Sequence, residues 1–159
     1  MAKIKTYCAL CGETSKSSEE PTICPVCKTN LADPGETVLK STYCRIIPEG
    51  ATAQTVKKGI LFLTDSRLFW LKRPAGNLYR RGLCDVIIEA IFPKQKELVF
   101  SFQHNEITSI EIDKLGPFKM LTLTARGKKV VLDVKAKERD EWLDAVKKLL
   151  QMDTNIKII

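Results

Sequence analysis

The sequence predicts a mainly β fold of the α+β class, organised around one hairpin. Gly59–Lys72 holds two short apolar runs, Ile60–Leu63 and Leu68–Leu71, on either side of the turn residues Thr64, Asp65 and Ser66. Runs this short and this rich in branched and aromatic residues indicate adjacent strands. Both faces of each strand are apolar, whereas a strand exposed on one side alternates with polar residues. The hairpin therefore predicts a closed or sandwiched β-structure that covers both of its sides.

The size and composition are those of a globular protein with one domain, or with one domain and a small accessory module. The chain has 159 residues, of which 44% are hydrophobic and 28% are charged. No apolar run approaches the roughly 20 residues that a membrane span needs. The first ten residues carry lysines without an apolar segment behind them, so no secretory signal is visible. We therefore expect a cytoplasmic protein with no transmembrane segment, whose cysteines are reduced unless they bind a metal.

The net charge of +7 lies in the C-terminal part of the chain. Residues 1–35 hold as many lysines as acidic residues, so the whole excess falls within residues 36–159. An excess of this size suits an anionic partner, and it also suits simple solubility. Nucleic acid is disfavoured as a partner of residues 1–35, because this neutral segment has one aromatic residue, Tyr7, for base stacking.

Two C-x2-C pairs are the strongest chemical signal in the sequence. Cys8 and Cys11 form the first pair, and Cys24 and Cys27 form the second after a spacer of twelve residues. Four soft sulfur ligands are enough to close a tetrahedral zinc site, and they leave no open position for a catalytic water. The spacer is too polar to fold by hydrophobic burial, so we expect its fold to depend on the metal.

Other chemistries are open to these four cysteines. They could form two disulfides, a thioredoxin-like redox pair or a rubredoxin-like iron site. The lack of a visible signal peptide and of a βαβ pattern speaks against the first two. Our interpretation is structural Zn²⁺, and iron remains the alternative metal. The pairs resemble a short zinc ribbon, although Lys28 stands where a glycine is more usual.

Strand patterns follow the linker at residues 31–35, where Pro34 and Gly35 indicate a turn. Residues 48–55 are expected to form a loop, and Leu115–Pro117 a turn. Arg126–Lys128 suits a hairpin turn with Gly127 in the left-handed conformation. We expect strands at residues 37–47, 60–63, 68–71, 98–102, 107–113, 120–125 and 130–134.

Two segments have the periodicity of amphipathic helices. Glu138–Gln151 places Trp142 and four aliphatic residues on one stripe, with acidic residues in its first turn and lysines near its end. A second apolar stripe runs through residues 78–92, within an insertion at about 73–96. We expect the second helix to pack on the flank of the domain, and the alternative is an interfacial helix that contacts a membrane or a partner. Residues 153–159 are expected to form a tail.

Seven strands followed by one amphipathic helix resemble the pleckstrin-homology fold. Individual strings are similar to those of its GRAM-type and bacterial relatives: Gly35–Leu39, Gly59–Leu68, Ile107–Glu111 and Glu141–Val146. The resemblance implies a seven-stranded antiparallel barrel or sandwich over residues 35–152, capped by the C-terminal helix, with the zinc ribbon at 1–34 as an addition. The later strands and the Trp142 helix would then enclose the central hairpin. Lipid binding, peptide binding and structural roles all occur in this superfold.

The resemblance implies a non-enzymatic binding or adaptor protein. In lipid-binding relatives, basic groups on the first strands and their loop contact phosphates. The corresponding residues here are Lys40, Arg45, Lys57, Lys58, Lys72 and Arg73. The first hypothesis is weak binding to an acidic membrane surface or phospholipid by a cytoplasmic, peripheral protein, and the alternative for these residues is a solvated basic rim.

The second hypothesis is a protein–protein interaction module that uses the ribbon and the inserted helix and has no lipid ligand. The sequence offers no catalytic constellation to either hypothesis. Its one histidine, His104, lies in a polar stretch at residues 103–106 that we interpret as an ordinary turn. We therefore expect a protein that is not an enzyme.

Overall fold

The computed structural model describes residues 3–32, 35–48, 56–73 and 96–152. The helix predicted at 78–92 and the tail at 153–159 lie outside the described residues. Within the part of the chain that is described, no helix has the length and apolar character needed to cross a membrane. The elements, in chain order, are β1 (Ile4–Tyr7), β2 (Thr14–Ser17), β3 (Val38–Ile47), β4 (Lys57–Thr64), β5 (Arg67–Lys72), β6 (Glu97–Gln103), the 3-10 helix η1 (His104–Glu106), β7 (Ile107–Leu115), β8 (Phe118–Ala125), β9 (Lys128–Asp133) and α2 (Ala136–Met152).

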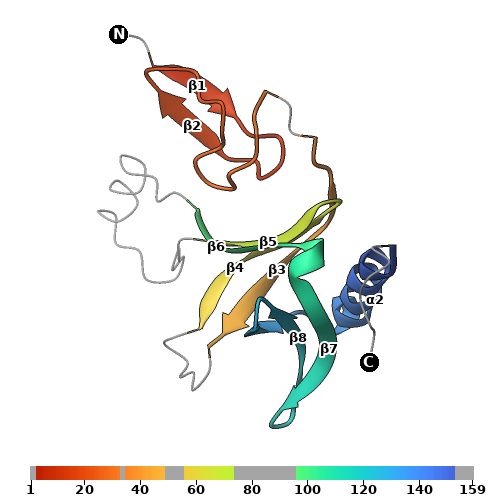
Figure 1. Ribbon diagram of the computed structural model, residues 1–159. Coiled ribbons are helices and arrows are strands. Elements are labelled where there is room, and N and C mark those ends of the chain that lie inside the picture. The colour runs from red at the N-terminus through yellow and green to blue at the C-terminus, as the bar shows by residue number, and fades with distance from the viewer. Residues whose placement is uncertain (1–2, 33–34, 49–55, 74–95, 153–159) are drawn as a thin grey trace, which may run out of the picture.

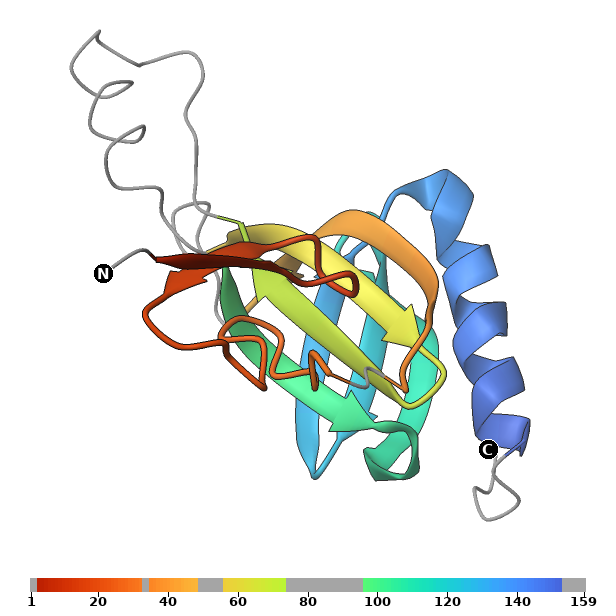
Figure 2. The same cartoon turned by 90° about the horizontal axis from the view of Figure 1, so that it is seen from above.

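Seven strands form one antiparallel sheet in the order β6-β5-β4-β3-β9-β8-β7. The sheet curls into a half-barrel, and its two edge strands, β6 and β7, follow each other in the chain through η1. Helix α2 lies along one side of the half-barrel, and the short β1–β2 hairpin lies over β4, β5 and β6 (Figure 1). Figure 2, which is a view from above, shows the β1–β2 hairpin lying across these strands. The predicted mainly β fold with a seven-stranded antiparallel sheet and a C-terminal helix is therefore confirmed.

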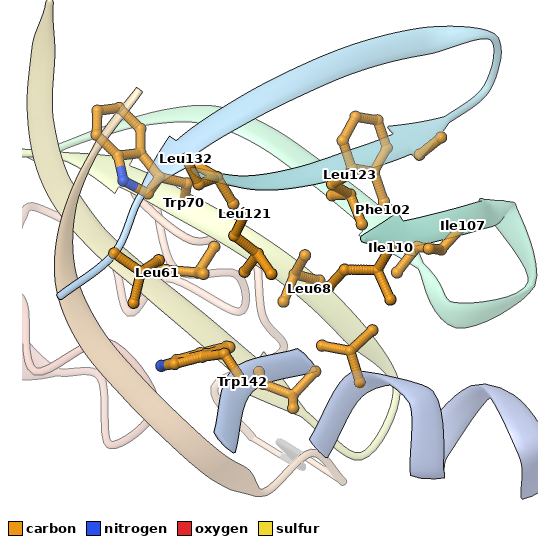
Figure 3. Close-up of a cluster of buried hydrophobic side chains, with 14 of the residues drawn as sticks. Leu61, Leu68, Trp70, Phe102, Ile107, Ile110, Leu121, Leu123, Leu132 and Trp142 are labelled. Carbon is orange, nitrogen blue, oxygen red and sulfur yellow. The ribbon is translucent and has the colours of Figure 1, made fainter. Parts of the chain in front are cut away.

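The main hydrophobic core fills the space between the inner face of the sheet and α2. Helix residue Trp142 is fully buried, and Val146 and Leu150 follow it on the same stripe. Figure 3 shows Trp142 facing Leu61 and Leu68 of the central hairpin. The predicted helical stripe therefore covers the sheet as expected, because an apolar helix face has to be buried against another element. Strand residues of this core include Cys44, Leu61, Leu63, Leu68, Trp70, Phe102, Ile107, Ile110, Leu121, Leu123 and Leu132.

A second hydrophobic cluster covers the outer face of the central hairpin. Phe62 and Phe69 stack there with ring centroids 4.9 Å apart. The N-terminal segment, residues 3–32, packs on this face through Leu10, Val26 and the four cysteines of the C-x2-C pairs. The sequence correctly predicts that both sides of the hairpin are covered. The later strands and α2 enclose only the inner side, however, and the N-terminal segment covers the outer one.

The strands are longer than their apolar runs, because backbone pairing continues into polar residues at both ends. The Arg126–Gly127 turn has both φ angles positive, at 49° and 71°, as a two-residue hairpin of type I′ requires. The turn predicted at residues 103–106 is one turn of 3-10 helix. His104 is buried in it, with Nε2 3.1 Å from the carbonyl oxygen of Thr64, so this histidine packs against the central hairpin.

Gly59 is required by the close approach of two strands. A Cβ atom at this position would lie 2.2 Å from the carbonyl oxygen of Leu71 and 2.4 Å from the ring of Trp70. Trp70 is fully buried, so its ring has no space into which it can retreat. The first residue of the central hairpin is therefore fixed by the tryptophan on the neighbouring strand.

We predict that Gly59→Ala lowers the free energy of unfolding by about 3 kcal/mol, the upper end of the usual cost of overpacking a core. Chemical denaturation followed by circular dichroism measures the change. Gly116→Ala is the control: it adds the same methyl group in open space at φ 61°, so it should cost about 1 kcal/mol. Equal losses in the two variants would contradict the steric explanation.

Candidate functional site

The two C-x2-C pairs form matching turns. In the first turn the backbone N–H of Gly12 donates to the carbonyl oxygen of Cys8 at 2.9 Å. In the second turn the N–H of Lys28 donates to the carbonyl oxygen of Cys24 at 3.0 Å. Both donors have left-handed backbones, with φ 71° at Gly12 and φ 65° at Lys28. Lys28 thus takes the glycine conformation in spite of its side chain, which costs about 1 kcal/mol.

The turns bring all four cysteine sulfurs together. Cys8, Cys11, Cys24 and Cys27 are buried, and their sulfur atoms lie within 4.8 Å of one another. The Cys8–Cys27 sulfurs are 3.7 Å apart, and the Cys11–Cys24 sulfurs are 3.8 Å apart. These distances exceed the roughly 2.05 Å of a disulfide. They match the edge of about 3.8 Å that a tetrahedron of sulfurs has when each lies about 2.3 Å from a central ion. The cluster could therefore hold a metal ion.

The protonation of the cluster also suits a cation. A hydrogen bond from the Cys11 thiol lowers the pKa of Cys27 to about 5. The same hydrogen bond, followed by burial, raises the pKa of Cys11, and burial raises that of Cys8. Cys27 therefore ionises more readily than Cys8 and Cys11, and a metal ion has to displace the protons of these two thiols. Metal affinity should consequently weaken as the pH falls.

A buried ion pair joins the N-terminal segment to the central hairpin. Glu36, just after the linker, accepts hydrogen bonds from Arg67 Nε at 2.8 Å, from Thr64 Oγ1 at 2.6 Å and from Thr29 Oγ1 at 2.9 Å. Thr29 in turn belongs to the second cysteine turn, where its carbonyl oxygen accepts the N–H of Cys24 at 2.8 Å. We call Glu36, Arg67, Thr64 and Thr29 the latch. It connects the backbone around the cysteines to the β4–β5 turn.

The latch carboxylate is held in its charged form. Burial alone would raise the pKa of Glu36, but the hydrogen bonds from Arg67, Thr64 and Thr29 outweigh it and bring this pKa below its ordinary value. The side chains of Arg67 and Glu36 are 9% and 10% exposed, so both charges are largely shielded from water. The Arg67 guanidinium also lies 4.5 Å from the ring centroid of Phe69, which ties the latch to the outer cluster.

We predict that Glu36→Gln destabilises the protein by about 3–5 kcal/mol, because Arg67 is left as a buried charge without its partner. Since the folded-state pKa of Glu36 is lowered, its contribution is complete above the ordinary value of 4.5 and disappears as the pH falls below it. When unfolding is measured at several pH values, the free energy of unfolding should therefore fall less on acidification for Glu36→Gln than for the unmodified protein. Asp113→Asn, which breaks the exposed pair with Lys129, is the control and should leave the free energy of unfolding nearly unchanged. Equal effects would contradict the latch.

Five of the six basic residues singled out in the sequence gather at one end of the sheet. Arg45 on β3 is the register partner of Lys58 on β4, and Lys72 on β5 is the partner of the adjacent Gly59. The backbone N–H of Arg73 donates to the carbonyl oxygen of Lys58 at 3.0 Å. We call this group the basic rim, which consists of Arg45, Lys57, Lys58, Lys72 and Arg73.

Lys40 does not belong to the basic rim. It pairs with Leu63, five positions along β4 from Lys58, and it faces α2 instead. Its Nζ lies 2.8 Å from Glu141 Oε2 and 5.8 Å from the ring centroid of Trp142. Lys40 therefore joins the first strand to the helix and is engaged within the fold.

The basic rim is only partly neutralised. Arg45 forms an ion pair with Asp133, and Lys72 lies 4.0 Å from Glu97. Within the described ranges, no carboxylate lies within ion-pair distance of Lys57, Lys58 or Arg73, whose side chains are exposed. The rim therefore presents cations to solvent.

Comparison with known proteins gives a likeness of fold. No family model and no curated protein matches the chain. The crystal structure of the C-terminal domain of an unknown protein from Leishmania infantum is similar with a TM-score of 0.51 and 21% identity, over 74% of this chain and 86% of that chain. The solution structure of the N-terminal PH domain of human ARAP2 has a TM-score of 0.48 and 11% identity, over 76% of this chain and 85% of that chain. At this identity the first likeness shows a shared fold alone.

Proposed function

We propose that this chain is a non-enzymatic binding protein whose basic rim contacts an acidic membrane surface. The observation that carries the proposal is the convergence of Arg45, Lys57, Lys58, Lys72 and Arg73 at one end of the half-barrel, three of them without a carboxylate partner among the described residues. Each basic residue near an anionic leaflet contributes about 1 kcal/mol, so several together support weak, salt-sensitive binding. The same proposal places the protein in the cytoplasm, at the periphery of a membrane.

We further propose that Cys8, Cys11, Cys24 and Cys27 bind Zn²⁺ in a structural role. The tetrahedral spacing of the sulfurs and their burial support this assignment. A site filled by four cysteines has no open coordination position, so the ion would hold the two turns together rather than take part in a reaction. As part of this proposal, residues 1–34 form a zinc ribbon, and the second domain begins at residue 35.

We predict that the purified protein carries stoichiometric zinc and that Cys8→Ser with Cys24→Ser abolishes it, as measured by elemental analysis. Chelation should also increase the binding of a hydrophobic dye, because the segment that covers Phe62 and Phe69 depends on the metal. Cys44→Ala is the control, since Cys44 lies in the main core. Iron with visible absorption, or no metal at all, would overturn the zinc assignment.

We predict that the protein floats with vesicles of phosphatidylcholine and phosphatidylserine at low salt, and that K57E/K58E weakens this binding at least about tenfold. K137E/K148E is the matched control, because it makes the same change of charge at two exposed positions of α2 that do not belong to the rim. Binding that is insensitive to salt and equal for both variants would contradict the role of the rim.

A protein partner is the second candidate, and a specific observation favours it. The N-terminal segment leaves Ile4, Tyr7 and Ile23 exposed, although most apolar residues of this segment pack on the sheet. Exposed aromatic and aliphatic side chains on a small module suit a contact with another protein. The insertion at 73–96, the other half of this hypothesis, lies outside the described residues apart from its first and last positions.

A further inference from the structure

The β7–β8 hairpin ends in a tip that projects from the body of the protein. Figure 1 shows this hairpin extending past α2 at the bottom of the view. Residues 113–119 are all exposed, and two of them are large apolar residues, Leu115 with 50% and Phe118 with 63% of its surface exposed. The proposed lipid contact of the basic rim does not use these residues.

The tip is a tight turn that presents its apolar pair on one face. Leu115 and Phe118 are register partners that close the hairpin, so their side chains lie on the same face of the two strands. Only Gly116 and Pro117 separate them, with Gly116 at φ 61°, which suits the first position of a type II′ turn. Because proline fixes its own φ angle, little conformational entropy is lost when the tip is buried.

The next register pair of the hairpin consists of Lys114 and Lys119. Like charges directly opposite each other destabilise a strand pair, and within the described ranges neither lysine has an ion-pair partner. The neighbouring carboxylate, Asp113, is instead bound to Lys129 at 3.0 Å. An external anion would therefore relieve the repulsion between the two lysines.

We propose that this tip inserts into an anionic lipid surface, with Leu115 and Phe118 entering the head-group region and Lys114 and Lys119 contacting lipid phosphates. An apolar end followed by a pair of cations matches the order of layers in a leaflet, since lysine stems extend along apolar surface while their ammonium groups stay in water. A narrow projecting turn offers far less than the roughly 800 Å² per partner of a standard protein interface. The lipid target therefore fits better than a protein partner.

This inference rests on the proposed membrane function for its target but uses a different element of the fold. The basic rim acts through charge, so its binding disappears at high salt. The tip adds apolar burial, which salt does not screen, so it should leave a salt-resistant fraction of binding. The two contributions can therefore be measured separately on the same protein.

Flotation with vesicles of phosphatidylcholine and phosphatidylserine, at low and high salt, tests the tip through L115S/F118S. We expect this variant to lose the salt-resistant fraction at least about tenfold. The matched control is L39S/Y43S, which removes two apolar side chains of similar exposure, 52% and 42%, from the outer face of β3. All the substituted side chains are exposed, so melting temperatures should stay close to that of the unmodified protein.

A direct readout comes from Phe118→Trp, because the natural residues Trp70 and Trp142 are fully buried. The emission of the new indole should shift to the blue with vesicles and be quenched by brominated lipid, whereas Tyr43→Trp should not respond. The proposal for the tip would be overturned if L115S/F118S floated at high salt as well as the unmodified protein. It would also be overturned if this variant lost binding to a protein partner and kept its binding to vesicles. Neither result would affect the proposal for the basic rim. Retained salt-resistant binding in K57E/K58E supports the tip even where the rim fails, and no binding by the unmodified protein overturns both.

Discussion

The packing of the N-terminal segment on the outer face of β4 and β5 is the contact on which the rest of the structure depends. Both strands are apolar on both faces, so a sheet with one covered side would leave Phe62, Phe69 and Leu71 in water. The segment that covers them cannot form a core of its own, because few apolar residues lie between its cysteines. The segment therefore covers the apolar face of the sheet, and the sheet provides the segment with a core. The four cysteines belong to the cluster that the two parts share.

The polar contacts reinforce the same junction. Glu36 lies just after the linker and binds residues of both parts, so the latch closes where the two chain segments separate. Its partner Arg67 is itself stacked on Phe69 of the outer cluster. Buried ion pairs contribute little net stability compared with apolar residues of the same size, but an arrangement that separates the two charges leaves each of them buried without a partner, at a cost of about 3–5 kcal/mol. The latch therefore sets the position of the N-terminal segment on the sheet more than it strengthens the contact.

The sequence predicts the strands and the helix better than it predicts which segments pack against one another. Periodicity alone identifies the strands around Leu61 and Trp70 and the helical stripe of Trp142, because each depends on local spacing. It does not reveal which segment covers Phe62, since any apolar surface would satisfy the pattern. The cysteine spacing predicts the cluster, whereas Glu36 gives no signal, because a single acidic residue after a linker is normally exposed. The resemblance places Lys40 with the lipid-facing residues, whereas its contact with Glu141 on the distant helix is visible only in three dimensions.

The position of β3 in the sheet has a consequence for how the chain folds during synthesis. This strand lies between β4 and β9, and its Arg45 pairs with Asp133, which is 88 residues further along the chain. The N-terminal segment, β3, β4 and β5 are all made before the rest of the sheet, and they contain every residue of the outer cluster except Leu98. Since the N-terminal part of a chain is synthesised first, the residues of the outer cluster are available for packing while one edge of β3 is still open. The cysteine turns would then already cover the apolar outer face of β4 and β5, while the edge of β3 stays unpaired until β9 arrives.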